Sequence, residues 1–91
     1  MTKEQYVTLD SYQFLSDEDK DNQRELCAKG NYGLTNNQVI TLARQHKKAR
    51  KENDYYAMAL IEFRLTHINF HSECGMLFRG QYDEVIARWK K

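Results

Sequence analysis

The sequence predicts an all-α protein: a small helical bundle built on an antiparallel helix hairpin, with short flanking helices. The 91 residues include no proline, which would interrupt a helix from within. Hydrophobic residues make up 41% and charged residues 30% of the chain, a balance typical of a globular protein. Apolar residues recur at helical spacing, most clearly in the second half. We therefore expect residues 1–91 to form a single helical domain.

The first predicted helix follows a mixed segment, residues 1–15, which we expect to be a short helix or an extended arm. Ser16 is an N-cap residue, and the acids at positions 17–19 favour a helix start because they oppose the helix dipole. The helix is predicted to end near Lys29, with Gly30 in the left-handed position that follows. Its mostly polar interior leaves it only a narrow apolar face.

The second predicted helix begins at Thr35, which has the spacing of a capping box with Gln38. A modest apolar stripe runs along this helix, formed by Val39, Leu42, Ala43 and Ala49. Its C-terminal half, residues 44–51, is strongly basic, where the helix dipole favours cations. Residues 52–54 favour a tight connection because Asn and Asp are good turn and cap residues.

The third predicted helix, Tyr55 to Phe78, is the most apolar segment. One apolar stripe contains Met58, Ile61, Leu65, Ile68 and Met76, and a second contains Leu60, Phe63, Phe70 and Leu77. A helix that is apolar on two sides is the central helix of a small bundle, and it also favours a homodimer. After Gly80, residues 81–91 predict a last short helix whose inward side chains are Tyr82, Val85, Ile86 and Trp89.

Charge and cysteine content exclude several classes of protein. The net charge of +1 favours neither a dedicated nucleic-acid-binding domain nor an acidic mimic of nucleic acid. Cys27 and Cys74 are too few for a disulfide framework. The chain has no signal segment and no apolar run long enough to cross a membrane. We expect a cytoplasmic protein with reduced thiols and no membrane contact.

The clearest surface feature is a basic ridge, defined by Arg44, Lys47, Lys48 and Lys51. Their offsets of three, four and seven place them on one helix face. Such a ridge suits an acidic protein surface, or a phosphate backbone whose bases would stack on the tyrosines just beyond it. A solvated helix face is the simplest alternative. The predicted partner-binding residues are Arg44, Lys47, Lys48, Lys51, Tyr55 and Tyr56.

A second candidate site is the trio His67, His71 and Cys74 on the third predicted helix. Offsets of four and three would place all three on one face, and imidazole and thiolate are zinc ligands. No acid follows the first histidine as a zinc protease requires. We therefore favour partly buried histidines beside an apolar cysteine, and expect no metal.

A polar stripe runs along the same helix and contains Glu62, Thr66, Asn69 and Glu73. If the stripe faces inward, it predicts a small-ligand pocket or a polar seam between subunits. It would then need cations opposite, such as Arg44, Lys48 or Arg64, because burying unpaired polar groups is costly. We favour the outward orientation, since every amphipathic helix needs a solvent face.

No sequence motif indicates an enzyme. The chain has no glycine-rich phosphate loop, no nucleophile elbow and no Cys-x-x-Cys pair, so we expect a non-enzymatic protein without a cofactor. Its size and composition are typical of inhibitors and adaptors, including phage-encoded modulators of host proteins. The leading hypothesis is docking on a protein partner. The alternatives are nucleic-acid binding through residues 44–51 and a metal or small-ligand site on the central helix.

Overall fold

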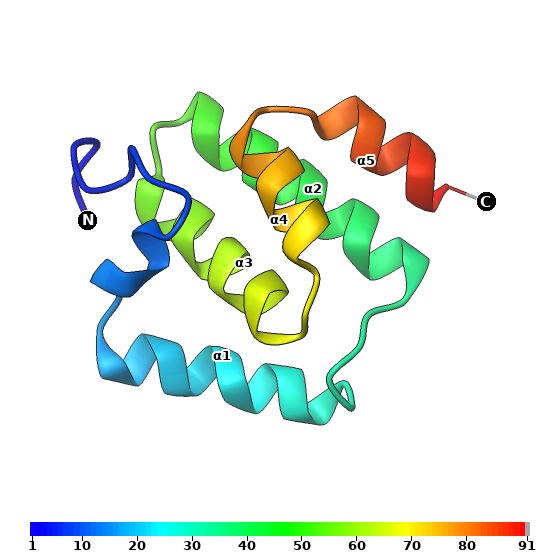
Figure 1. Cartoon of the computed structure of the whole chain (residues 1–91), viewed down its shortest axis with the longest axis horizontal. Coiled ribbons are helices and arrows are strands. Elements are labelled where there is room, and N and C mark those ends of the chain that lie inside the picture. Colours follow the sequence, from blue (N-terminus) through cyan, green and yellow to red (C-terminus); the bar gives the residue numbers. More distant parts are fainter. Residues whose placement is uncertain (91) are drawn as a thin grey trace.

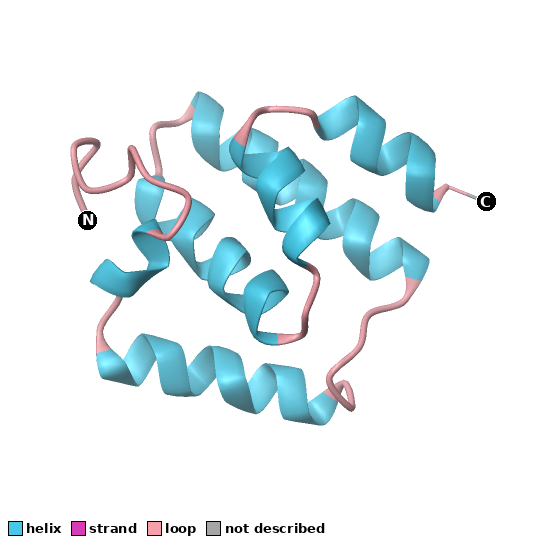
Figure 2. Ribbon diagram, viewed as in Figure 1, coloured by secondary structure: helices cyan, strands magenta, loops and turns pink. Residues whose placement is uncertain are grey.

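The computed structural model describes residues 1–90, which form five α-helices and a short 3-10 helix and contain no strand (Figures 1 and 2). The elements are η1 Ser11–Phe14, α1 Asp17–Lys29, α2 Asn36–Lys51, α3 Tyr55–His67, α4 His71–Phe78 and α5 Tyr82–Trp89. The all-α prediction is confirmed. None of these helices is long and apolar enough to cross a membrane. Lys91, predicted to end the last helix, lies outside the described residues.

Helices α2 and α3 form the predicted antiparallel hairpin, and one helix packs on each flank of it (Figure 1). Helix α1 packs on α3, α5 packs on α2, and α4 lies across the hairpin in contact with α2, α3 and α5. Helix α3 is therefore the central helix, as predicted. Its apolar sides are covered by helices of the same chain, so they no longer favour a homodimer, which stays a prediction.

Local capping signals fix where the helices begin. The Ser16 hydroxyl accepts a hydrogen bond of 3.1 Å from the Asp19 backbone N–H, as its N-cap role predicts. Thr35 and Gln38 form the predicted capping box, with bonds of 2.8 and 3.2 Å. The Asp54 carboxylate caps α3 by accepting from the N–H of Ala57 at 3.1 Å.

Four helices end on a residue in the left-handed conformation, which turns the chain back onto the core. These residues are Asn31 (φ 54°), Asn53 (58°), Asn69 (65°) and Gly80 (81°). Each is followed by a residue whose N–H bonds a carbonyl five positions back, as Phe70 does to Leu65 at 2.8 Å. Asparagine takes this role because its short polar side chain tolerates the left-handed region.

The first helix ends at Lys29 as predicted, but two other predictions are wrong because an asparagine takes the left-handed conformation. The left-handed residue after α1 is Asn31, one position beyond Gly30. The helix predicted over Tyr55 to Phe78 is broken at Asn69, so that α3 ends at His67 and α4 starts at His71. The break lets α4 fold back across the hairpin, and the apolar stripes of one predicted helix enclose the core from two directions.

The main core lies where α2, α3, α4 and α5 meet. It contains Val39, Leu42, Ala43, Ile61, Leu65, Cys74, Met76, Leu77, Tyr82 and Val85. The inward residues predicted for the last helix are confirmed, because Tyr82 and Val85 are buried while Ile86 and Trp89 pack against this core. The N-terminal segment adds two buried residues that pack on the hairpin away from this core. Tyr6 packs with Ala49 and Met58, and Leu15 packs with Ala59 and Phe63.

Candidate functional site

The basic ridge lies on the face of α2 that points away from the core. All four of its side chains are exposed, whereas Val39, Ala43 and His46 on the opposite face are buried. Within residues 1–90 the ridge has one ion pair, between Lys47 Nζ and Asp83 Oδ1 at 3.9 Å. Both partners are solvent-exposed, so this pair contributes little to stability. The ridge therefore presents positive charge that the described part of the chain leaves largely unpaired.

The two tyrosines beyond the ridge have partners within the chain. The Tyr55 ring is half-buried and packs on Tyr6 with a centroid distance of 5.6 Å. The Tyr56 hydroxyl donates to Asp19 Oδ1 at 2.6 Å. This hydrogen bond lowers the pKa of the Asp19 carboxyl and raises the pKa of the Tyr56 phenol. Because Glu18 adds further negative charge near Tyr56, the surroundings of Tyr56 oppose a polyanion.

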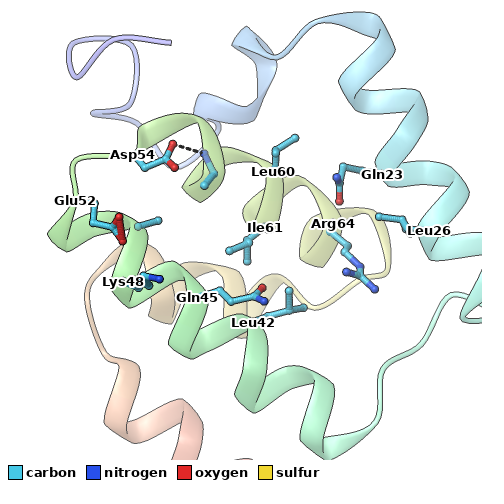
Figure 3. Close-up of a pocket in the computed structure, with 12 residues that line it drawn as sticks. Gln23, Leu26, Leu42, Gln45, Lys48, Glu52, Asp54, Leu60, Ile61 and Arg64 are labelled. Atoms are coloured by element: carbon cyan, nitrogen blue, oxygen red, sulfur yellow. Dashed lines mark hydrogen bonds between the residues drawn. The ribbon is translucent and has the colours of Figure 1, made fainter.

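A groove runs beside the ridge, with α3 as its floor and α1 and α2 as its walls (Figure 3). Its main hollow has a volume of about 470 Å³. The apolar lining consists of Leu26 from α1, Leu42 and Ala49 from α2, and Ala57, Leu60 and Ile61 from α3. Lys48 belongs to both the ridge and the groove, so the two surfaces are continuous. A second hollow of about 280 Å³ extends the groove along the first half of α2.

Arg64 is the cation at the centre of the groove. It lines both hollows and extends from α3 into the space between Leu26 and Leu42 (Figure 3). Its Nε is enclosed and has no acceptor in the described part of the chain. No carboxylate among residues 1–90 forms an ion pair with it. The groove thus holds a guanidinium that residues 1–90 leave without a hydrogen-bond acceptor.

A cluster of four hydrogen-bonded polar side chains is enclosed in the core and joins four segments of the chain. Glu62 Oε2 accepts hydrogen bonds from the Tyr6 hydroxyl and, at 2.8 Å, from His46 Nε2. His46 Nδ1 lies 2.7 Å from the Tyr82 hydroxyl. The side chains of His46 and Glu62 are 0% exposed. We call this group the buried network, defined by Tyr6, His46, Glu62 and Tyr82.

Burial keeps the two phenols of the buried network, Tyr6 and Tyr82, protonated. Desolvation raises the pKa of Tyr6 far above its usual value, and the hydrogen bond and charge of Glu62 raise it further. Desolvation also raises the pKa of Tyr82, although the nearby Arg50 guanidinium opposes that shift. Both phenols therefore stay protonated: the Tyr6 hydroxyl donates to Glu62 Oε2, and the Tyr82 hydroxyl lies within hydrogen-bonding distance of His46 Nδ1. Sealed from solvent, the network ties the N-terminal segment to α2, α3 and α5.

The favoured outward orientation of the polar stripe is wrong at two of its four positions. Glu62 is fully buried, and Glu73 is nearly so, with Arg88 and the Trp89 indole N–H each 3.4 Å from its Oε1. Asn69 is exposed and Thr66 is half-buried. The cations expected opposite an inward stripe, Arg44, Lys48 and Arg64, are not its partners: Glu62 pairs with His46, and Glu73 pairs with Arg88.

His46 lies within the basic stretch 44–51 but is fully buried, unlike the side chains of the ridge. Its spacing carried a usable signal, because it lies three residues after Ala43 and three before Ala49 on the apolar stripe of α2. Glu62 carried a similar signal, lying between the buried Met58 and Leu65 on the central helix.

The trio His67, His71 and Cys74 is not presented on one helix face, because the break at Asn69 separates His67 from the other two. Both histidines are exposed, while Cys74 is buried and its thiol lies between Thr66 and the Glu62 carbonyl. Burial raises the pKa of this thiol to about 11, which disfavours the thiolate that binds metals. Residues 1–90 contain no cluster of three His, Cys, Asp or Glu side chains placed to hold a metal ion.

No protein family model, curated protein or solved structure matches this chain. The surface of the chain is therefore what indicates a function. Two adjoining features of that surface distinguish it: the basic ridge on the outer face of α2, and the apolar groove beside it with Arg64 at its centre.

Proposed function

We propose that this chain is a small non-enzymatic binding protein, of the inhibitor or adaptor type, that docks on an acidic protein partner through the basic ridge of α2. The observation that supports the proposal most is the unpaired charge of the ridge. Arg44, Lys48 and Lys51 make no ion pair within residues 1–90, and Lys47 reaches only an exposed carboxylate. A charged surface of this kind sets the rate and orientation of association with a partner of opposite charge.

Three observations favour a protein partner over nucleic acid. The chain as a whole carries a net charge of only +1, whereas nucleic-acid-binding domains are usually strongly basic. Of the two tyrosines expected to stack on bases, Tyr55 packs on Tyr6, and Tyr56 donates its hydroxyl to the Asp19 carboxylate. The groove next to the ridge supplies apolar contact area, which proteins use at the centre of an interface. Two buried free cysteines, Cys27 and Cys74, accord with a reducing compartment such as the cytoplasm.

The test removes the ridge and leaves the groove intact. The ridge variant carries Arg44→Ala, Lys47→Ala and Lys51→Ala, three exposed positions that do not line the groove. The matched control carries Lys3→Ala, Lys29→Ala and Lys90→Ala, which remove the same charge elsewhere on the surface. Cross-linked partners from the cells that express the chain are identified by mass spectrometry, at low and high salt.

We expect a protein that the wild type and the control both capture, that the ridge variant loses, and that high salt weakens. Binding to RNA and DNA is measured in parallel. Tight nucleic-acid binding at physiological salt that disappears in the ridge variant would overturn the proposal and support the nucleic-acid alternative.

A further inference from the structure

The groove has the length and position to bind one more helix. No Cα of α1 lies within 8 Å of a Cα of α2, so both helices rest on α3 without closing over it. The two hollows extend along α2 from Asn37 to Glu52. At 1.5 Å per residue this is about 22 Å, the length of a helix of about 15 residues. An amphipathic helix binds such a groove by laying its apolar face on the floor.

The charges in the groove indicate which helix would fit. Arg64 lies at the centre, with Lys48 beside the groove floor, and neither has an ionic partner within residues 1–90. Glu52 and Asp54 lie at the end formed by the α2–α3 turn. A complementary helix would carry a carboxylate near its middle and a cation at the end beside Glu52. Pairing with the Arg64 guanidinium would be charge-assisted and directional.

We infer that the groove between α1 and α2 binds an amphipathic helix of the protein partner, whose apolar side chains lie on α3 and whose aspartate or glutamate pairs with Arg64. This inference rests on the proposed function, because the ridge would bring an acidic partner to the edge of the groove. Leu26 of α1 lines one wall of the groove, and Leu42 and Gln45 of α2 line the other (Figure 3), so these side chains would contact the docked helix. Arg64 determines the preference for an acidic helix.

The experiment uses a fluorescently labelled synthetic helix of about 15 residues. Its leucines follow the i, i+3, i+4, i+7 spacing, and a single glutamate lies at its centre. A matched peptide carries glutamine in place of that glutamate. Fluorescence anisotropy with the full chain is expected to give at least about tenfold tighter binding for the acidic peptide.

Three variants test the geometry. Arg64→Gln is expected to abolish the preference for glutamate over glutamine. Leu26→Glu places an acid on a wall residue that is 41% exposed, so it should weaken both peptides without unfolding the chain. The matched control Val7→Glu changes an apolar residue that is 68% exposed and lies outside the groove, and it should change neither affinity.

The outcomes separate this inference from the proposed function. The ridge variant is expected to keep the preference for the acidic peptide, because Arg44, Lys47 and Lys51 do not line the groove. If the ridge variant loses the cellular partner but keeps the preference for the acidic peptide, the assignment of the groove is supported independently of the ridge. Equal affinities, no binding of either peptide, or a preference that survives Arg64→Gln would each overturn the inference. A dimer of the free chain that Leu26→Glu dissociates would also overturn it, by assigning the groove to a second copy.

Discussion

Replacing Glu62 with alanine tests whether the buried network holds the fold together. Glu62 Oε2 is the acceptor for both Tyr6 and His46, and the side chain is fully enclosed. A hydrogen bond to a charged group contributes about 1.5–3 kcal/mol net. Leaving a buried donor without an acceptor costs about 1–3 kcal/mol, and removal of the carboxylate leaves two such groups, Tyr6 and His46. We expect Glu62→Ala to lower the free energy of unfolding by about 3–5 kcal/mol.

A loss of this size is a large share of the roughly 5–15 kcal/mol that stabilises a typical domain. The free energy of unfolding is obtained from urea titration followed by far-ultraviolet circular dichroism, with linear extrapolation to water. Glu62→Gln separates charge from volume, because the amide keeps an acceptor oxygen. Its loss is expected to be smaller, about 1–2 kcal/mol.

Glu4→Ala is the matched control, because Glu4 is exposed and its removal should change stability by less than about 0.5 kcal/mol. A loss below about 1 kcal/mol in Glu62→Ala, with an unchanged dependence on urea, would refute the reasoning. It would mean that His46 and Tyr6 find other partners or reach water when the carboxylate is absent.

Three further predictions concern the core, a helix end and alkaline pH. Leu65 is 1% exposed in the middle of α3, so Leu65→Ala should lower the free energy of unfolding by about 2–5 kcal/mol in the same titration. Asn69 has a φ of 65°, so Asn69→Ala should destabilise by about 1–2 kcal/mol, whereas Asn69→Gly should come within about 0.5 kcal/mol of the wild type; equal losses would contradict the assigned conformation. Burial raises the pKa of Cys74 from 9.0 to about 11 and raises the pKa values of Tyr6 and Tyr82 above 10.0. Because the folded chain holds these protons more tightly than the unfolded chain, the contribution of these three groups to stability should be constant below about pH 9, and stability should fall as the pH rises from there towards 11. Undiminished stability near pH 11 would contradict these burial assignments.

Signals that act within one helical turn were sufficient to predict where three helices start. Ser16, Thr35 and Asp54 cap their helices through bonds to backbone three residues away, so their effect does not depend on the rest of the fold. The apolar spacing identified the hairpin and its central helix for a related reason, because a two-sided apolar helix has to be covered on both sides. The break at Asn69 was missed because asparagine permits the left-handed turn without requiring it.

The sequence by itself determined an all-α hairpin, its flanking helices and the ridge on the outer face of α2. Only the tertiary structure decided which polar residues are interior. His46 and Glu62 are 16 residues apart, and Tyr6 is 56 residues from Glu62, so no local pattern joins them. The groove is likewise a product of packing, since it exists because α1 and α2 both rest on α3 without meeting. Contacts of this range depend on how whole helices pack. The sequence therefore predicted the ridge of the candidate docking site but not the groove beside it.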